Sequence, residues 1–183
     1  ESNVVNLQTT AVAGEASFAT LRFKGELAQS YSLVISSSGL VQVETNDFQV
    51  VPGPLGGFEF ISEPQGTTNG EALGGDESGI NYPKLQMKDR FGNTISDDSN
   101  TVVTATIGAG ANGSLAGSVS AQAVNGELSF ENLRLSGHTS ESYTITFTAG
   151  SVNITSDTVT LTPAAPSQLT IESQDTTGDA GVQ

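Results

Sequence analysis

The sequence contains no cysteine and no tryptophan, and only 6 of its 183 residues are Lys or Arg. The absence of cysteine excludes disulfides, zinc–thiolate sites and cysteine nucleophiles. Because 20 acidic residues oppose those 6 basic ones, the formal net charge is −14. Such a surface repels phosphate groups, so we expect no binding to nucleic acid and no attraction to anionic membranes.

Long apolar runs are also missing from the sequence. No segment approaches the roughly 20 apolar residues that cross a bilayer as a helix, so we expect no membrane insertion. Glu1 is not followed by the charged and then apolar pattern of a secretion signal. We therefore expect Glu1 to be a mature terminus or a point within a longer protein.

Short segments of alternating polarity dominate what is present. In residues 143–148 the apolar side chains Tyr143, Ile145 and Phe147 alternate with threonines, which is the period of a β-strand with one buried face. No segment shows a convincing apolar stripe of helical period. The pattern predicts strands over residues 57–62, 82–88, 102–107, 119–124, 127–133 and 152–161.

Asn125-Gly126 lies between two of these predicted strands and is the strongest short signal for a β-hairpin, because both turn residues need positive φ. Seven or so short strands joined by turns predict an all-β Greek-key sandwich. Tyr31 and Tyr143 each precede an inward aliphatic residue by two positions, as the tyrosine corner of such sandwiches does. We expect both tyrosines to have that structural role.

The sequence repeats internally. Residues 12–36 and 124–148 align without a gap, with 10 of 25 positions identical and an offset of 124 − 12 = 112 residues. After a slip of one residue the match continues from 50–52 to 161–163, and 58–60 correspond to 169–171. Repeats of this kind are typical of tandem domain arrays.

The repeat predicts one complete and two partial domains. We expect a complete sandwich over residues 55–165, the second half of a preceding unit over 1–54, and the first strand of a following unit over 166–183. The proline-bearing segments 52–54 and 163–166 are the predicted linkers, because proline stiffens a connection and ends strand pairing.

Several motifs resemble one known family. Residues 85–95 (LQMKDRFGNTI) resemble the D-x-x-G-N turn of bacterial immunoglobulin-like domains of the invasin and intimin type. Residues 102–107 resemble the strand that follows this turn, and Asn125-Gly126 resembles the later hairpin. Residues 137–149 are similar to the glycine, tyrosine and alanine pattern of the family.

The resemblance implies tandem immunoglobulin-like Greek-key sandwiches in an extracellular protein of the bacterial cell surface. Members of the family are mostly stalk modules of large surface proteins and adhesins. We therefore expect a non-enzymatic structural repeat that acts as a stalk or spacer, with no known ligand. The acidic loop 71–79 departs from the family pattern and leaves a ligand-binding module as a further alternative.

Catalytic residues are sparse. His138 is the only histidine, and its counterpart in the first copy is Glu26, so the repeat does not keep it. A hydrolytic triad needs a histidine held by a carboxylate and facing a nucleophile. The pair Asp97-Asp98 lies in a predicted turn, where solvated carboxylates are common. We expect no enzymatic activity.

Calcium is the one candidate cofactor. The candidate ligands lie around the turn at Gly92, and hard cations bind where several oxygen atoms converge. The sequence lacks the D-x-D-x-D-G loop, however, and Asp and Asn also serve as turn residues that bond their own backbone. The candidate metal ligands are Asp89, Asn93, Asp97 and Asp98.

The partial units raise the question of a partner. The inward residues of segment 1–54 would face no opposing sheet, which leaves open strand edges. Neighbouring repeats in cis would complete them in a long stalk. Alternatively, a neighbouring subunit in trans would add a strand and build a filament, although residues 166–183 supply only one strand. The inward residues are Phe18, Leu21, Tyr31, Leu33, Ile35 and Val50.

Overall fold

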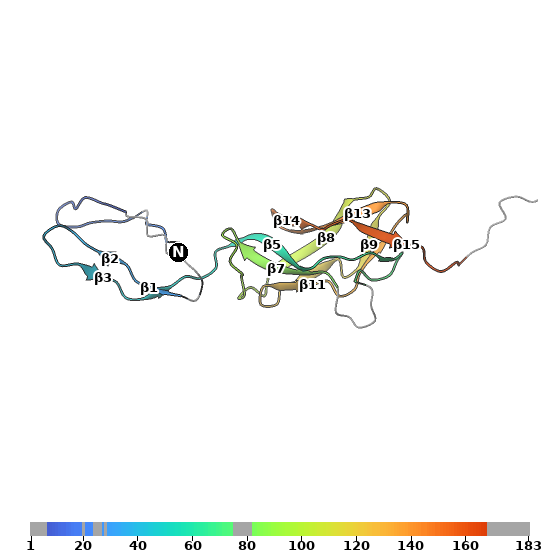
Figure 1. The fold of residues 1–183 in the computed structure, drawn as a ribbon, viewed down its shortest axis with the longest axis horizontal. Coiled ribbons are helices and arrows are strands. Elements are labelled where there is room, and N and C mark those ends of the chain that lie inside the picture. The colour runs from blue at the N-terminus through green and yellow to red at the C-terminus, as the bar shows by residue number, and fades with distance from the viewer. Residues whose placement is uncertain (1–6, 20, 24–26, 28, 75–81, 168–183) are drawn as a thin grey trace, which may run out of the picture.

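The computed structural model describes residues 7–19, 21–23, 27, 29–74 and 82–167. All regular structure in this part of the chain is β-strand, and none of it is a helix long and apolar enough to cross a membrane. Figure 1 shows a large two-layered unit connected through an extended linker to a smaller N-terminal segment. The expectation of an all-β chain is confirmed for the described residues.

The first layer is built around two eight-residue strands, β8 (Val102–Ala109) and β13 (Ser142–Ala149), which pair antiparallel. The strand order in this layer is β10 (Ser120–Gln122), β8, β13, β15 (Val159–Thr162) and β6 (Thr67–Thr68), and β14 (Val152–Thr155) also pairs with β13. The short strand β6 pairs parallel with β15 at the far edge, whereas the other pairs are antiparallel.

The second layer is a three-stranded antiparallel sheet with β7 (Lys84–Asp89) in the middle. β5 (Leu55–Ser62) and β11 (Glu127–Ser129) form its edges. A separate pair, β9 (Ser114–Gly117) with β12 (Leu133–Ser136), also belongs to this unit.

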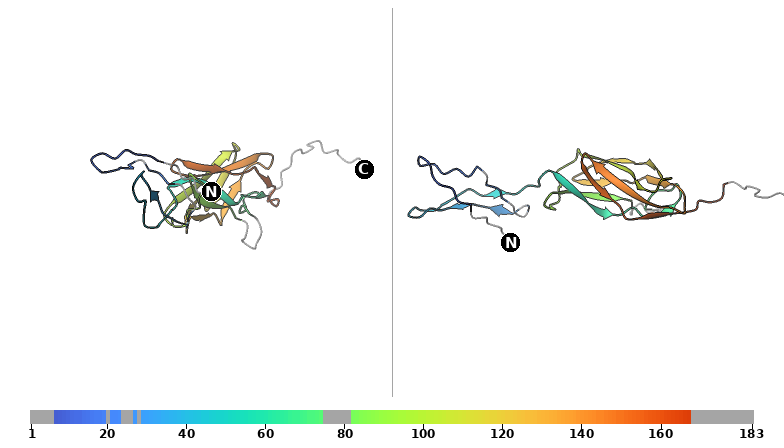
Figure 2. Two further views of the ribbon diagram at one scale, coloured as in Figure 1. Left: turned by 60° about the vertical axis from the view of Figure 1, so that its left-hand side comes forward. Right: turned by 90° about the horizontal axis from the view of Figure 1, so that it is seen from above.

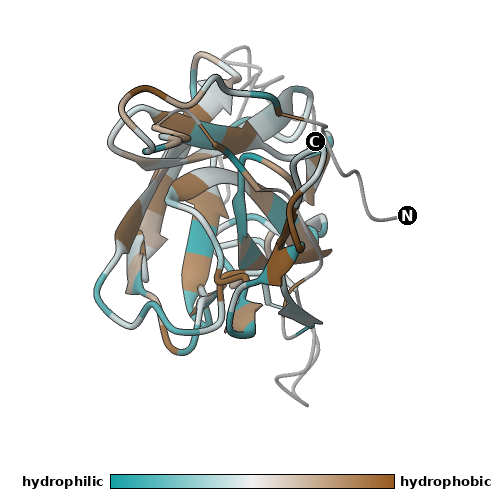
Figure 3. Ribbon diagram, turned by 90° about the vertical axis from the view of Figure 1, so that its left-hand side faces the viewer, coloured by the Kyte–Doolittle hydropathy of each residue, from teal (hydrophilic) through white to brown (hydrophobic). Residues whose placement is uncertain are grey.

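The core lies between the layers and follows from the period of two. Leu85 and Met87 of β7 and Tyr143, Ile145 and Phe147 of β13 are all fully buried, and the residues between them are more exposed. Figure 3 shows hydrophobic and hydrophilic residues alternating along the strands. The remaining fully or nearly fully buried hydrophobic residues are Leu73, Ile95, Val103, Ala105, Ala123, Leu128, Phe130, Leu133, Leu135, Val159 and Leu161.

Tyr143 has the role expected from its position. Its side chain is fully buried, and its hydroxyl donates a 3.0 Å hydrogen bond to the backbone carbonyl of His138, five residues upstream. Tyr31 is half-buried, and its ring packs edge-on against Phe23 at a centroid distance of 4.7 Å. The geometry of a tyrosine corner is therefore present at Tyr143.

The N-terminal segment carries two short antiparallel pairs. β1 (Ser30–Tyr31) pairs with β4 (Phe48–Gln49), and β2 (Val34–Ile35) pairs with β3 (Val43–Glu44). Figure 2 shows these strands and the larger unit on opposite sides of the linker. None of the described residues from 7 to 53 is buried, so this segment has no core of its own.

The predicted turn at Asn125-Gly126 forms, but the strands on either side of it do not pair with each other as a hairpin. The turn forms, with φ of 51° at Asn125 and 77° at Gly126, but only the Val124–Glu127 pair bridges it. β10 before the turn pairs with β8, and β11 after it pairs with β7. The turn therefore connects the two layers, because each flanking strand finds its partner in a different sheet.

Two predicted strands are also divided. Segment 127–133 contains β11 and the first residue of β12, which pair with different strands. Segment 152–161 breaks at Ser156, whose hydroxyl accepts a 3.0 Å hydrogen bond from the Ile145 amide. The strand predicted at 169–171 lies outside the described residues.

Candidate functional site

The junction between the linker and the larger unit contains the most elaborate polar site in the described chain. Asp89 ends β7, and its side chain is buried, with 4% of the residue exposed. Oδ1 accepts hydrogen bonds from the amides of Phe91 (2.8 Å) and Asn93 (2.9 Å). Oδ2 accepts from Asn93 Nδ2 and from the Gly53 amide, both at 3.0 Å.

The turn around Asp89 follows from its sequence. Gly92 has φ of 83°, a left-handed conformation that glycine adopts at little cost. The Gly92 amide donates to the Asp89 carbonyl at 3.0 Å, and the Asp89 amide donates to the Asn93 carbonyl at 2.9 Å. The D-x-x-G-N motif therefore makes a closed turn that directs one carboxylate oxygen toward the linker.

The linker lies directly against this turn. Gly53 follows Pro52, and its amide is the group bound by Asp89. A side chain at Gly56 would have its Cβ 2.4 Å from the Arg90 amide nitrogen, so glycine is required for this approach. Residues 53–56, which lead from the linker into β5, are therefore held against the Asp89 turn.

Two opposing effects act on the pKa of Asp89. Burial, the largest single influence, raises the pKa, but the hydrogen bonds from Gly53, Asn93 and Phe91 together outweigh it and hold the pKa well below its ordinary value. The folded protein therefore stabilises the carboxylate form, which accepts all four bonds.

Asp98 caps a second turn. Its Oδ1 accepts from the amides of Asn100 and Thr101, both at 2.8 Å, and Oδ2 accepts from the Thr101 hydroxyl at 2.7 Å. The Thr101 and Asn100 amides and the Thr101 hydroxyl lower the pKa of Asp98. The backbone carbonyl of Asp98 accepts a 2.7 Å hydrogen bond from the Gly126 amide, and this bond joins the Asp98 turn to the Asn125-Gly126 turn.

The four candidate calcium ligands divide between these two turns. Asp89 and Asn93 contact each other, whereas Asp98 is engaged in its own turn and Asp97 is exposed. In the described part of the chain, no three or more His, Asp or Glu side chains are grouped so that they could hold a metal ion. The candidate ligands are thus divided between two turns, and the acidic loop lies partly outside the described residues, at 75–79.

His138 is exposed, with its Nδ1 3.6 Å from Glu141 Oε1. Its backbone carbonyl, rather than its ring, has the structural contact, since it accepts the Tyr143 hydroxyl. The ring thus lies on the surface beside one carboxylate.

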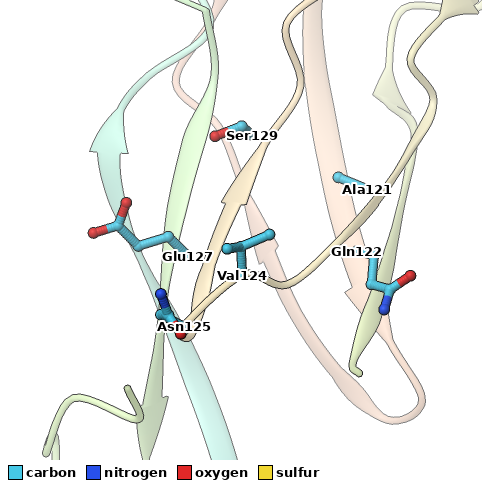
Figure 4. Close-up of a pocket in the computed structure, with 6 residues that line it drawn as sticks. All are labelled: Ala121, Gln122, Val124, Asn125, Glu127 and Ser129. Carbon is cyan, nitrogen blue, oxygen red and sulfur yellow. The ribbon is translucent and has the colours of Figure 1, made fainter. Parts of the chain in front are cut away.

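An open hollow of about 520 Å³ lies beside the Asn125-Gly126 turn. Figure 4 shows its lining residues spread over β10, β11 and the turn, with the side chains of Gln122 and Glu127 pointing away from each other. Glu127 is the only ionisable residue of the lining. The lining residues are Ala121, Gln122, Val124, Asn125, Glu127 and Ser129.

The bond from Gly53 to Asp89 is the feature that the sequence did not reveal. The two residues are 36 positions apart, and the motif around Asp89 explains its local turn without reference to the linker. The proline-bearing linker and the D-x-x-G-N turn were each recognisable, but no pattern indicated that they touch.

The described fold is thus an all-β unit whose linker is hydrogen-bonded to the Asp89 carboxylate through the Gly53 amide. No family model matches the sequence, and no curated protein matches it. Among solved structures, domains 4 and 5 of the S-layer protein SbsC are similar at a TM-score of 0.39 and 16% identity. The match covers 72% of this chain and 65% of that chain, which is under two thirds of its length.

Proposed function

We propose that this chain is a non-enzymatic structural repeat of an extracellular bacterial surface protein, in which immunoglobulin-like Greek-key sandwiches act as a stalk or spacer. A spacer needs units that fold around their own cores and joints that keep a direction. The larger unit supplies the core, because sixteen hydrophobic residues are buried in one cluster.

The observation that carries the proposal is the bond between the linker and Asp89. Pro52 and Pro54 fix only their own φ, so a linker held solely by its covalent ends would still turn about φ and ψ of Gly53. Here the Gly53 amide is held by a carboxylate that three further hydrogen bonds fix in place. This arrangement limits the directions in which the linker leaves the unit, as a stiff joint requires.

Two further features support the finer description. The bond from the Tyr143 hydroxyl to the His138 carbonyl matches the tyrosine corner of immunoglobulin-like sandwiches. The net charge of −14 and the lack of cysteine suit a protein that stays soluble outside the cell without disulfides. Neither feature calls for a catalytic centre.

Small-angle scattering from the full chain tests the spacer. A stiff joint predicts the distance distribution of one elongated particle with a defined maximum length. The same profile should persist at about 0.5 M salt, where the Debye length is only ~4 Å and charge repulsion no longer stretches the chain. A salt-dependent length, or the profile of freely jointed units, would contradict the spacer.

A filament subunit is the second candidate, and the uncovered apolar side chains of the N-terminal segment favour it. Val43 is 64% exposed and Ile35 is 45% exposed, although both lie on paired strands. A neighbouring chain that covered them would make the protein self-associate. Sedimentation over a range of concentrations distinguishes this candidate from a monomeric spacer unit.

A further inference from the structure

The N-terminal segment repeats the backbone conformation of the second half of the larger unit, beginning at a tight turn. In turn 12–15 the outer residues exchange backbone hydrogen bonds of 2.9 and 3.1 Å, and in turn 124–127 they exchange bonds of 2.8 and 3.1 Å. The two central residues have φ of 55° and 85° in the first turn, and 51° and 77° in the second. The two turns are 112 residues apart, as the sequence repeat requires.

The strand register repeats as well. Tyr31 of β1 lies opposite Phe48 of β4, and Tyr143 of β13 lies opposite Val159 of β15. The same correspondence holds for β2 with β3 and for β13 with β14, after the one-residue slip in the connecting turn. A chance resemblance of two sequences would not preserve cross-strand partners.

A side-chain hydrogen bond is also repeated. The Leu33 amide donates to the Thr45 hydroxyl at 3.0 Å, and the Thr45 amide donates to the Leu33 carbonyl at 2.9 Å. In the larger unit, Ile145 and Ser156 make the same two bonds, at 3.0 and 2.9 Å. The N-terminal segment is therefore half of a sandwich, already in its folded pairing.

The N-terminal segment and the second half of the larger unit differ in how far their apolar side chains are buried. Five residues of the N-terminal segment form what we call the N-terminal apolar face, and Leu21 and Ile35 of this face are 40% and 45% exposed. Their five counterparts in the larger unit are all 0% exposed. The face consists of Phe18, Leu21, Tyr31, Leu33 and Ile35, and the counterparts are Phe130, Leu133, Tyr143, Ile145 and Phe147.

The strands that cover these counterparts and have no equivalent among the described residues of the N-terminal segment come from the first half of the larger unit. β5 and β7 supply the opposing layer, where Phe60 meets the Phe147 ring edge-on at 5.8 Å and Leu85 is fully buried. β8 pairs with the edge of β13 that β15 and β14 leave open. In the described part of the N-terminal segment, β1 pairs with β4 and β2 pairs with β3 in two-stranded sheets, and no described strand takes the place that β8 has beside β13.

We infer that the N-terminal apolar face receives three strands equivalent to β5, β7 and β8, supplied by the same polypeptide ahead of residue 12. The order within the larger unit is the reason for this source, because there the first half directly precedes the second half in the chain. This inference deepens the proposed function and rests on the repeat, but it concerns what covers residues 18–35 and not the stiffness of the linker.

The inference is tested with a grafted chain in which a copy of the first half of the larger unit precedes the whole N-terminal segment from Val12. A second copy of residues 55–123 replaces residues 1–11, so that Ala123 of the copy is followed by Val12, as Val124 follows it in the larger unit. We expect the amides of Leu33 and Thr45 to exchange with deuterium about a thousandfold more slowly in the graft than in the parent chain, since a folded unit protects them.

The control is the same graft with Leu85→Asp and Met87→Asp in the added copy alone, because both side chains are fully buried in the native unit. Exchange at Leu33 and Thr45 should then return to the rate in the parent chain. Unchanged exchange in the first graft would overturn the inference. Protection in the ungrafted chain that rises with concentration, together with a dimer in sedimentation, would also overturn it, because a second copy would then cover the face.

These outcomes are separable from those of the proposed function. The scattering profile reports on the linker and on Asp89, whereas the exchange rates report on residues 18–45. A graft that gains protection while the joint stays flexible would leave this inference standing and refute the stiff spacer.

Discussion

At the scale of single residues, Asp89 shows how one carboxylate can connect two parts of a chain. Its two oxygens accept four N–H groups, and one of these belongs to the linker. Oxygens used in this way are poorly available to a cation, since calcium needs several oxygen ligands that converge on it. Asp89 therefore fixes the backbone of its own turn and of the linker at Gly53.

Replacing Asp89 with Asn should make stability depend less on pH. Because the folded-state pKa is lowered from an ordinary value of 3.8, the carboxylate stabilises the fold above that pH, and this contribution is lost as the pH falls through the folded-state pKa. We expect Asp89→Asn to melt about 5 °C lower at pH 7, with the difference shrinking below about pH 4. The control Asp97→Asn, at an exposed position, should melt within about 1 °C of the native chain.

Calcium removal is the second test at this scale. We expect the melting temperature in excess EDTA to stay within about 1 °C of its value in millimolar calcium, because a ligand that binds only the folded state would raise it measurably. A fall of several degrees on chelation would assign a calcium site to the acidic residues of the chain.

The Tyr143 hydroxyl offers a third test. Tyr143→Phe removes the donor to the His138 carbonyl while it keeps the buried ring, so we expect a loss of about 1–2 kcal/mol in the free energy of unfolding. Tyr82→Phe, at a partly exposed position, should cost less than about 0.5 kcal/mol. Equal effects in urea denaturation would contradict a specific role for the Tyr143 hydroxyl.

Residue roles were predictable where the partner is local. Tyr143 was identified because its spacing to Ile145 is a sequence pattern, and its acceptor lies five residues away. The pattern around Asp89 and Asn93 predicted either a turn or a cation site, because both uses need the same oxygen-bearing side chains. The contact with Gly53 depends on tertiary structure, which one sequence does not reveal.

At the scale of structural elements, the turn at Gly126 determines how the two layers are joined. A Cβ at Gly126 would lie 1.6 Å from the Ile95 carbonyl oxygen, in addition to the strain of φ at 77°. The turn therefore packs against the loop after β7, and the Gln86 side chain donates to the Gly126 carbonyl at 3.0 Å.

Gly126→Ala should cost about 3 kcal/mol or more, because it adds a backbone clash to a strained φ. Gly150→Ala is the matched control, since Gly150 also has positive φ, at 58°, but nothing within 4 Å of its Cβ position. It should cost about 1 kcal/mol. Similar losses for the two variants in chemical denaturation would show that the close approach at Gly126 contributes nothing.

Most long strands could be predicted because one buried face imposes alternation. β5, β7, β8 and β13 lie within two residues of their expected limits. The short strands β6 and β9 were missed, since two to four residues carry too little alternation to identify them. The change of sheet at Asn125-Gly126 could not be read locally, because strand partners are chosen by tertiary contacts.

At the scale of the whole molecule, the chain combines one unit that has a core with a half that has the same strand pairing but no buried residue among those the structure describes. The registers of β1–β4 and β13–β15 correspond residue by residue across the sequence repeat. The division into one complete and two partial domains stays a prediction. The contact of the linker with Asp89 was not predictable, because it is a tertiary contact between residues 36 positions apart.

The central claim is that the bond from Gly53 to Asp89 stiffens the joint. It is tested most directly by the distance between spin labels placed on either side, and the absence of native cysteine makes the labelling specific. With labels on Gln49→Cys and Ser151→Cys, both exposed positions, we expect one narrow distance distribution in the native background and in Asp97→Ala. Asp89→Ala should broaden it severalfold. A distribution equally broad in all three backgrounds would contradict the stiff joint.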